Sequence, residues 1–148
     1  MTTIYLIRHA QKASIAGDPG LTPLGQNQAR ETGEYLRQLP ITKIFSSPYK
    51  RTRETAAEIA QVLQLEHTIH DALAERMNWD DPSVAWKDFL QEWVKATKER
   101  DYLPKYGDSS RQTGKRIQDL LAQSAENDEH IVLVSHGGAI LDYLRNIC

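Results

Sequence analysis

The sequence has a single cysteine and no long hydrophobic run. Cys148, the last residue, has no second cysteine with which to form an intramolecular disulfide. The apolar run from Ile4 to Ile7 is too short for a signal peptide, and no segment is long and apolar enough to predict a membrane span. These absences favour a reducing compartment. We therefore expect a cytoplasmic protein with no membrane partner.

An excess of basic charge is absent as well. The formal net charge is −2, and no run of like charges stands out, which argues against a nucleic-acid partner. Internal repeats, low-complexity tracts and linkers rich in glycine or serine are also missing. Because 40% of the 148 residues are hydrophobic, we expect a single domain over residues 1–148 with a sizeable core.

Short β-rich apolar segments alternate with segments of helical periodicity. The expected strands are residues 3–8, 41–45, 66–70 and 130–136. The expected helices are residues 21–39 and 47–63, an amphipathic stretch with Trp86, Phe89, Leu90 and Trp93 on one side, residues 114–124, and a final helix with Ile140, Leu141 and Leu144 together. This alternation predicts an α/β three-layer sandwich, with a mostly parallel central sheet and helices on both faces.

Two of the expected helices have recognisable starts. Thr22 followed by Pro23 is typical of an N-cap and the first helical position after it. Ser47 followed by Pro48 has the same pattern, so Ser47 is the expected N-cap of the next helix.

Polar residues gather where three of the strands end. They are Arg8 and His9, Ser46 and Ser47, and Ser135 and His136. Since parallel sheets bind ligands beyond the carboxyl ends of their strands, these residues indicate a common site. With Arg51 one helical turn along, two histidines and two arginines suit a phosphate group. Taken alone, the pattern around Arg51 favours solvated helix surface paired with Glu54 or Glu58.

Five short motifs occur in a fixed order. They read "RHA", "SSPYKRTRETA", "LAERMNW", "YGDSS" and "VSHGGAI". Together they extend from Ile4 to Ile140 and resemble the histidine phosphatase superfamily, in the branch that includes the phosphoglycerate mutases.

This resemblance implies a role for each matching residue. His9 matches the nucleophile that becomes a phosphohistidine. Arg8, Arg51 and His136, with Gly137, match the groups that hold the phosphoryl oxygens. Glu75 matches the acid and base, with a pKa raised so that it stays protonated near neutral pH. No metal and no cofactor is implied, because the family uses none.

Other residues have less definite roles. Thr22, Ser47 and residues 107–109 match family positions near the site. Lys12 and Arg76 are candidates for holding a second anionic group, or for plain solvated surface. Three histidines without a matching motif are expected to be structural or exposed, namely His67, His70 and His130. The variable segment from Met77 to Tyr106, within a cap of residues 71–110, is expected to roof the pocket and to set specificity.

The sequence departs from the family pattern in three places. Ala10 stands where the first motif usually has glycine, and an asparagine that often follows is missing, with Gln11 or Asn27 as candidate substitutes. Family chains usually continue beyond the helix that ends here at Cys148. An uncovered sheet edge or apolar surface favours pairing, so we expect a homodimer.

The leading hypothesis is a metal-independent phosphomonoesterase acting on a small phosphorylated metabolite. A mutase is disfavoured, because the longer insertion of phosphoglycerate mutases is missing. One alternative is a protein phosphohistidine phosphatase, suggested by "RHA" and the short chain but disfavoured by Glu75. The other is a non-catalytic phosphate-binding module, suggested by Ala10 and the short C-terminus.

Overall fold

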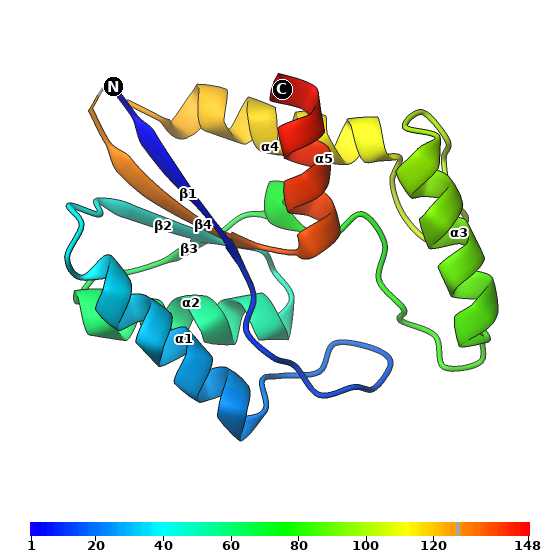
Figure 1. The fold of residues 1–148 in the computed structure, drawn as a ribbon, viewed down its shortest axis with the longest axis horizontal. Coiled ribbons are helices and arrows are strands. Elements are labelled where there is room, and N and C mark those ends of the chain that lie inside the picture. The colour runs from blue at the N-terminus through cyan, green and yellow to red at the C-terminus, as the bar shows by residue number, and fades with distance from the viewer. Residues whose placement is uncertain (127) are drawn as a thin grey trace.

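The computed structural model describes residues 1–126 and 128–148, and it confirms the expected α/β architecture. Four parallel strands form one sheet in the order β1-β4-β2-β3. They are β1 (Thr3–Arg8), β2 (Lys43–Ser46), β3 (Thr68–Ile69) and β4 (His130–Ser135). Figure 1 shows the sheet between two layers of helices.

The central strand β4 explains the three layers. Residues 131–134 of β4 are completely buried, and successive side chains point to opposite faces of the sheet. Ile131 and Leu133 pack into one hydrophobic cluster, whereas Val132 and Val134 pack into another. A continuous apolar strand is therefore required, because both faces of the sheet are covered.

The helices divide between the two faces (Figure 1). One face is covered by α1 (Pro23–Leu36) and α2 (Lys50–Leu63), which pack on each other and contribute Leu36, Ile59 and Ala60 to their cluster. The opposite face is covered by α4 (Ser110–Ser124), α5 (Gly137–Ile147) and the short 3-10 helix η1 (Asp71–Leu73).

The helix starts agree with the sequence at one place and differ at two. Thr22 caps α1 as expected, accepting a hydrogen bond from the Gly25 backbone nitrogen, with Pro23 in the first turn. The prediction of Ser47 as the N-cap of α2 is wrong, because Tyr49 holds that position and the Ser47 hydroxyl is used elsewhere. Helix α4 begins at Ser110, four residues before the expected start, where Ser109 and Gln112 form a capping box.

The segment between η1 and α4 lies beside the layered part of the molecule. It contains α3 (Trp86–Lys98), the expected amphipathic helix. Met77, Phe89 and Ala96 are buried there in a third hydrophobic cluster. Figure 1 shows α3 at the side of the molecule, next to the end of the sheet where α5 begins. Of the helices in the described ranges, none is both long and apolar enough to cross a membrane.

Candidate active site

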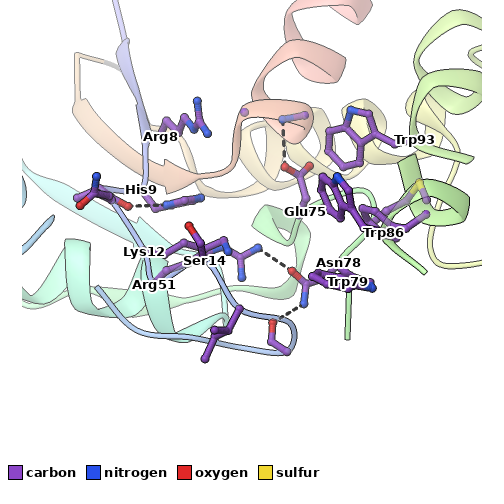
Figure 2. A pocket seen from close by; sticks show the side chains of 18 of the residues that line it. Arg8, His9, Lys12, Ser14, Arg51, Glu75, Asn78, Trp79, Trp86 and Trp93 are labelled. Atoms are coloured by element: carbon purple, nitrogen blue, oxygen red, sulfur yellow. Dashed lines mark hydrogen bonds between the residues drawn. The ribbon is translucent and has the colours of Figure 1, made fainter. Parts of the chain in front are cut away.

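A pocket of about 840 Å³ lies at the carboxyl end of the sheet, where Arg8 and His9 at the end of β1 line it. The strand register explains this, because Arg8 pairs with Ser135 and Ser46 pairs with Val134, so that the strands end nearly level. Five of the residues singled out as catalytic or phosphate-binding line the pocket, namely Arg8, His9, Arg51, Glu75 and Gly137. Figure 2 shows Arg8, His9 and Arg51 on one side and Glu75 opposite them.

His9 is arranged as a neutral imidazole with one free nitrogen. Its Nδ1 lies 2.7 Å from the Ala10 carbonyl oxygen. A carbonyl can only accept, so Nδ1 carries the proton and Nε2 keeps its lone pair. Burial lowers the pKa of His9 to about 4, and the charges of Arg51 and Arg8 act in the same direction. The ring is therefore uncharged at neutral pH.

His136 is adjacent to His9 but is not among the residues that line the pocket. It is 1% exposed, and its ring centroid is 5.4 Å from that of His9, with the two ring planes 64° apart. Burial, followed by the charge of Arg51, lowers the pKa of His136 to about 2. At neutral pH the two histidines therefore supply hydrogen-bonding nitrogens rather than positive charges.

A buried serine orients His136. The Oγ atom of Ser47 lies 2.7 Å from His136 Nε2, with both side chains buried. His136 Nδ1 is buried and has no hydrogen-bond partner among the described residues. Ser47 matches a family position near the site, and its contact with His136 gives it a structural role there.

Arg51 is the most confined cation of the pocket. It lies in the first turn of α2, is 3% exposed, and donates from Nη2 to Asn78 Oδ1 at 2.9 Å. Its guanidinium stacks over the Tyr49 ring at 4.6 Å. Nε and Nη1 are buried and donate no hydrogen bond within the described chain, although Nη1 lies 3.8 Å from Asp18 Oδ1 in a long ion pair. Both nitrogens can therefore donate to an anion. Solvated surface is the wrong interpretation of Arg51.

Glu75 sits against the first turn of α5. Its carboxylate accepts hydrogen bonds from the backbone nitrogens of Arg76 at 2.8 Å and Gly138 at 3.1 Å. Burial raises the pKa of Glu75, and these amide donors oppose that rise only in part. The direction agrees with an acid that keeps its proton at higher pH than an exposed glutamate.

The secondary candidates separate into two groups. Lys12 and Gln11 line the pocket, and Thr22 donates to Gln11 Oε1 at 2.7 Å.

Asn27 lies on the exposed surface of α1 and is not among the lining residues, so it does not replace the missing asparagine. Ala10 lines the pocket, and its backbone nitrogen donates to Thr55 Oγ1 at 3.0 Å.

Arg76 and residues 107–109 are held elsewhere. Arg76 is 1% exposed and pairs with Asp142, with its Nη1 3.0 Å from Oδ1. Both proposed interpretations of Arg76, an anion grip and solvated surface, are therefore wrong. Residues 107–109 do not line this pocket: Gly107 bridges to Met77, and Ser109 caps α4.

The three remaining histidines lie away from the pocket. His70 is exposed and accepts a hydrogen bond from the Ala72 backbone nitrogen, and His130 contacts the Tyr5 hydroxyl. His67 is partly exposed and does not line the pocket. Across residues 1–126 and 128–148, no group of three or more His, Cys, Asp or Glu side chains could hold a metal ion.

Two features of the pocket were missed from the sequence. Asn78 lines it and anchors Arg51, although it belongs to the motif "LAERMNW", from which only Glu75 received a role. The polar amide of Asn78, three residues after Glu75, is the sequence feature that could have indicated this role. Trp79, Trp86 and Trp93 also line the pocket; they belong to the segment expected to roof it, but the sequence assigned them no individual role.

Comparison with known proteins agrees with this geometry. A model of the histidine phosphatase superfamily (branch 1) matches residues 4–148. The uncharacterized phosphatase PhoE of Bacillus subtilis is 30% identical over 155 residues, covering 99% of this chain and 78% of the relative. The probable phosphoglycerate mutase GpmB of Salmonella paratyphi A is 31% identical over 156 residues, covering 95% of this chain and 72% of the relative.

The fold is shared with solved structures as well. A mycobacterial glucosyl-3-phosphoglycerate phosphatase aligns with a TM-score of 0.77 over 96% of this chain and 77% of that one. The two sequences are 23% identical, a level at which the likeness concerns the fold alone.

Proposed function

This chain belongs to the histidine phosphatase superfamily, and from that membership we propose that it is a metal-independent phosphomonoesterase with a phosphohistidine intermediate on His9. Its substrate is a small phosphorylated molecule. A relative that carries the name phosphatase, at 30% identity over nearly the whole chain, supports this choice.

One observation carries the proposal. The free Nε2 of His9 shares a pocket with two buried guanidinium nitrogens of Arg51 that donate no hydrogen bond within the described chain. A phosphate ester supplies both an electrophilic phosphorus for the imidazole and oxygens for the guanidinium. Arg8 and Lys12 add positive charge to the same pocket, so the dianion is neutralised by side chains alone.

In the first step, His9 Nε2 attacks phosphorus as the bond from phosphorus to the ester oxygen breaks. Glu75, in its protonated form, gives its proton to the departing oxygen, which leaves as an alcohol. Arg51 and His136 hold the equatorial oxygens, where charge is spread in the transition state. The products of this step are phosphohistidine, the free alcohol and an ionised Glu75.

In the second step, water attacks the phosphohistidine. The Glu75 carboxylate takes a proton from that water as the new bond to phosphorus forms and the bond from phosphorus to nitrogen breaks. Inorganic phosphate leaves, and both His9 and Glu75 return to their starting protonation states. One side chain thus serves as acid and then as base.

The test is an aryl phosphate assay in EDTA, comparing wild type with His9→Ala. We expect turnover by the wild type, loss of turnover in the variant, and a label on the wild-type protein that is labile in acid and stable in base. Equal rates for the two proteins would rule out the covalent mechanism.

The protein phosphohistidine phosphatase is distinguished by Glu75→Gln. Phosphohistidine has a good leaving group, so its hydrolysis would hardly depend on the Glu75 proton, whereas ester hydrolysis would fall severely. The position of Glu75 in the pocket, with a raised pKa, favours the esterase. A non-catalytic module would bind phosphate without turning over any ester.

A further inference from the structure

The wall of the pocket that faces the cations is apolar and aromatic. It is formed by Met77, Trp79, Trp86, Phe89, Leu90 and Trp93. The rings contact one another in sequence: Trp79 and Trp86 have centroids 5.3 Å apart, and Trp86 and Phe89 have centroids 5.5 Å apart. We call these six side chains the aromatic wall. Figure 2 shows the three tryptophans across from Arg8, His9 and Lys12.

Part of the aromatic wall is left exposed by the packing of the protein. Phe89 and Met77 are buried, but Trp86 is 53% exposed and Leu90 is 42% exposed, although both line a concave pocket. When a ligand covers an apolar ring that is exposed to water in a pocket, apolar surface is removed from water and binding is stabilised. The exposed face of Trp86 is therefore a surface that a substrate can cover.

The aromatic wall has no cationic side chain of its own for holding a second anion. Trp79 donates its indole N–H to the Val84 carbonyl at 2.9 Å, so this donor is occupied. Arg76 lies 4.4 Å from the Trp93 ring, but it is paired with Asp142 and buried behind it. The lining cations Arg8, Lys12 and Arg51 all belong to the opposite side.

We propose that the alcohol released by this enzyme carries a flat apolar ring, and that Trp86 selects esters of this class over carboxylate-bearing esters. The inference rests on the proposed function and specifies its substrate class. With the phosphoryl group between His9 and Arg51, the ester oxygen faces Glu75 and the organic part extends toward the aromatic wall. Trp93 adjoins Glu75 at Gly138, which makes this path continuous.

The test compares three esters of alcohols, so that the leaving groups are chemically alike: 2-naphthylmethyl phosphate, glycerol 2-phosphate and 3-phosphoglycerate. We expect kcat/KM in the wild type to be highest for the naphthylmethyl ester. In Trp86→Ala, its ratio to glycerol 2-phosphate should fall about tenfold, as expected for losing one aromatic contact. Tyr35→Ala is the matched control, because Tyr35 is a 67% exposed aromatic residue on α1 outside the pocket.

A binding measurement separates this inference from the proposed function. The non-hydrolysable 2-naphthylmethylphosphonate should bind the wild type more tightly than methylphosphonate, and Trp86→Ala should abolish most of that difference. If this holds but no ester is hydrolysed, the apolar subsite stands and the phosphatase proposal fails. If all three esters react equally well and Trp86→Ala changes no ratio, the substrate class is wrong while the phosphatase proposal stands.

Discussion

The Glu75 carboxylate occupies the space that a side chain at Gly138 would need. A Cβ atom built on Gly138 would lie 2.5 Å from Glu75 Oε1, whereas one on Gly137 would come no closer than 3.6 Å to Arg8. Two adjacent glycines of one helical turn therefore have different requirements, and this difference provides a test of the Glu75 position.

A Cβ on Gly138 would also lie 2.7 Å from the Trp93 ring, so we expect Gly138→Ala to displace Glu75 together with Trp93. It should lower kcat for ester hydrolysis about 100-fold, a loss typical of misplacing a catalytic group by about 1 Å. Gly137→Ala should lose less than about tenfold, because its methyl group makes an ordinary van der Waals contact. Steady-state kinetics on one ester measure both variants. Equal losses in the two variants would contradict the placement of Glu75.

The pH dependence of kcat/KM should be bell-shaped. Activity should rise as His9 loses its proton around pH 4 and becomes nucleophilic, and it should fall above the raised pKa of Glu75 as the acid ionises. Glu75→Gln should keep the rising limb at a much lower rate and lose the part of the falling limb that Glu75 contributes. Using one substrate for both proteins cancels the substrate's own ionisation near pH 6. Identical falling limbs would contradict the role of Glu75.

Ser47→Ala should loosen the His136 ring and lower kcat by about 10- to 100-fold, because a transition-state contact loses its orientation. Ser46→Ala is the matched control: Ser46 is also buried at the end of β2, but its hydroxyl donates to the Ser47 carbonyl and not to His136. The kinetic loss should be confined to the Ser47 variant. Equal effects on kcat would mean that Ser47 acts through stability alone.

The Arg76–Asp142 pair should matter for stability. Its side chains are 1% and 0% exposed, and Ser110 also donates to Asp142 at 2.6 Å. Asp142→Asn leaves the Arg76 charge buried without a counter-ion and should lower the free energy of unfolding by about 3–5 kcal/mol. The exposed pair of Lys115 and Asp119 is the control.

Asp119→Asn should change the free energy of unfolding by less than about 1 kcal/mol, because that pair is 66% and 51% exposed and screened by water. Urea unfolding of both variants gives the comparison. If the Asp142 variant is as stable as the Asp119 variant, the buried pair contributes little to the fold.

The homodimer expected from the sequence stays a prediction. Strand β1 forms one edge of the sheet, and α5 exposes Leu141, Leu144 and Ile147. Such a surface favours pairing with a second copy of the chain. Sedimentation at increasing concentration should give the mass of two chains, and a monomer at high concentration would refute the idea.

The fold could be predicted from the sequence because residues 131–134, the middle of β4, are all apolar. A strand buried on both faces requires helices on both sides, and the alternation of elements supplies them. The start of α2 could not be predicted correctly. Ser47 has the right residue type for an N-cap, but tertiary contact with His136 uses its hydroxyl, and local sequence does not report that contact.

The site could be predicted where polar residues follow strands, and less well elsewhere. His9 and Arg51 come together because parallel strands end at one edge of the sheet. The burial of Arg76 could not be predicted, because its partner Asp142 is 66 residues away and no spacing rule connects the two. The aromatic wall lies within the segment that was expected to roof the pocket. Amphipathic spacing predicts which side of α3 is apolar, but not which of its side chains line the pocket.

The third hydrophobic cluster, around Phe89, is separate from the two clusters that enclose the sheet. The exposed side chains of the aromatic wall, Trp86 and Leu90, therefore stand apart from the two clusters that enclose the sheet. Such a division makes selectivity evolvable: these two positions can be diversified in a library while Asn78, which holds Arg51, and the buried Met77 and Phe89 are kept. A laboratory effort to redirect this enzyme should begin there.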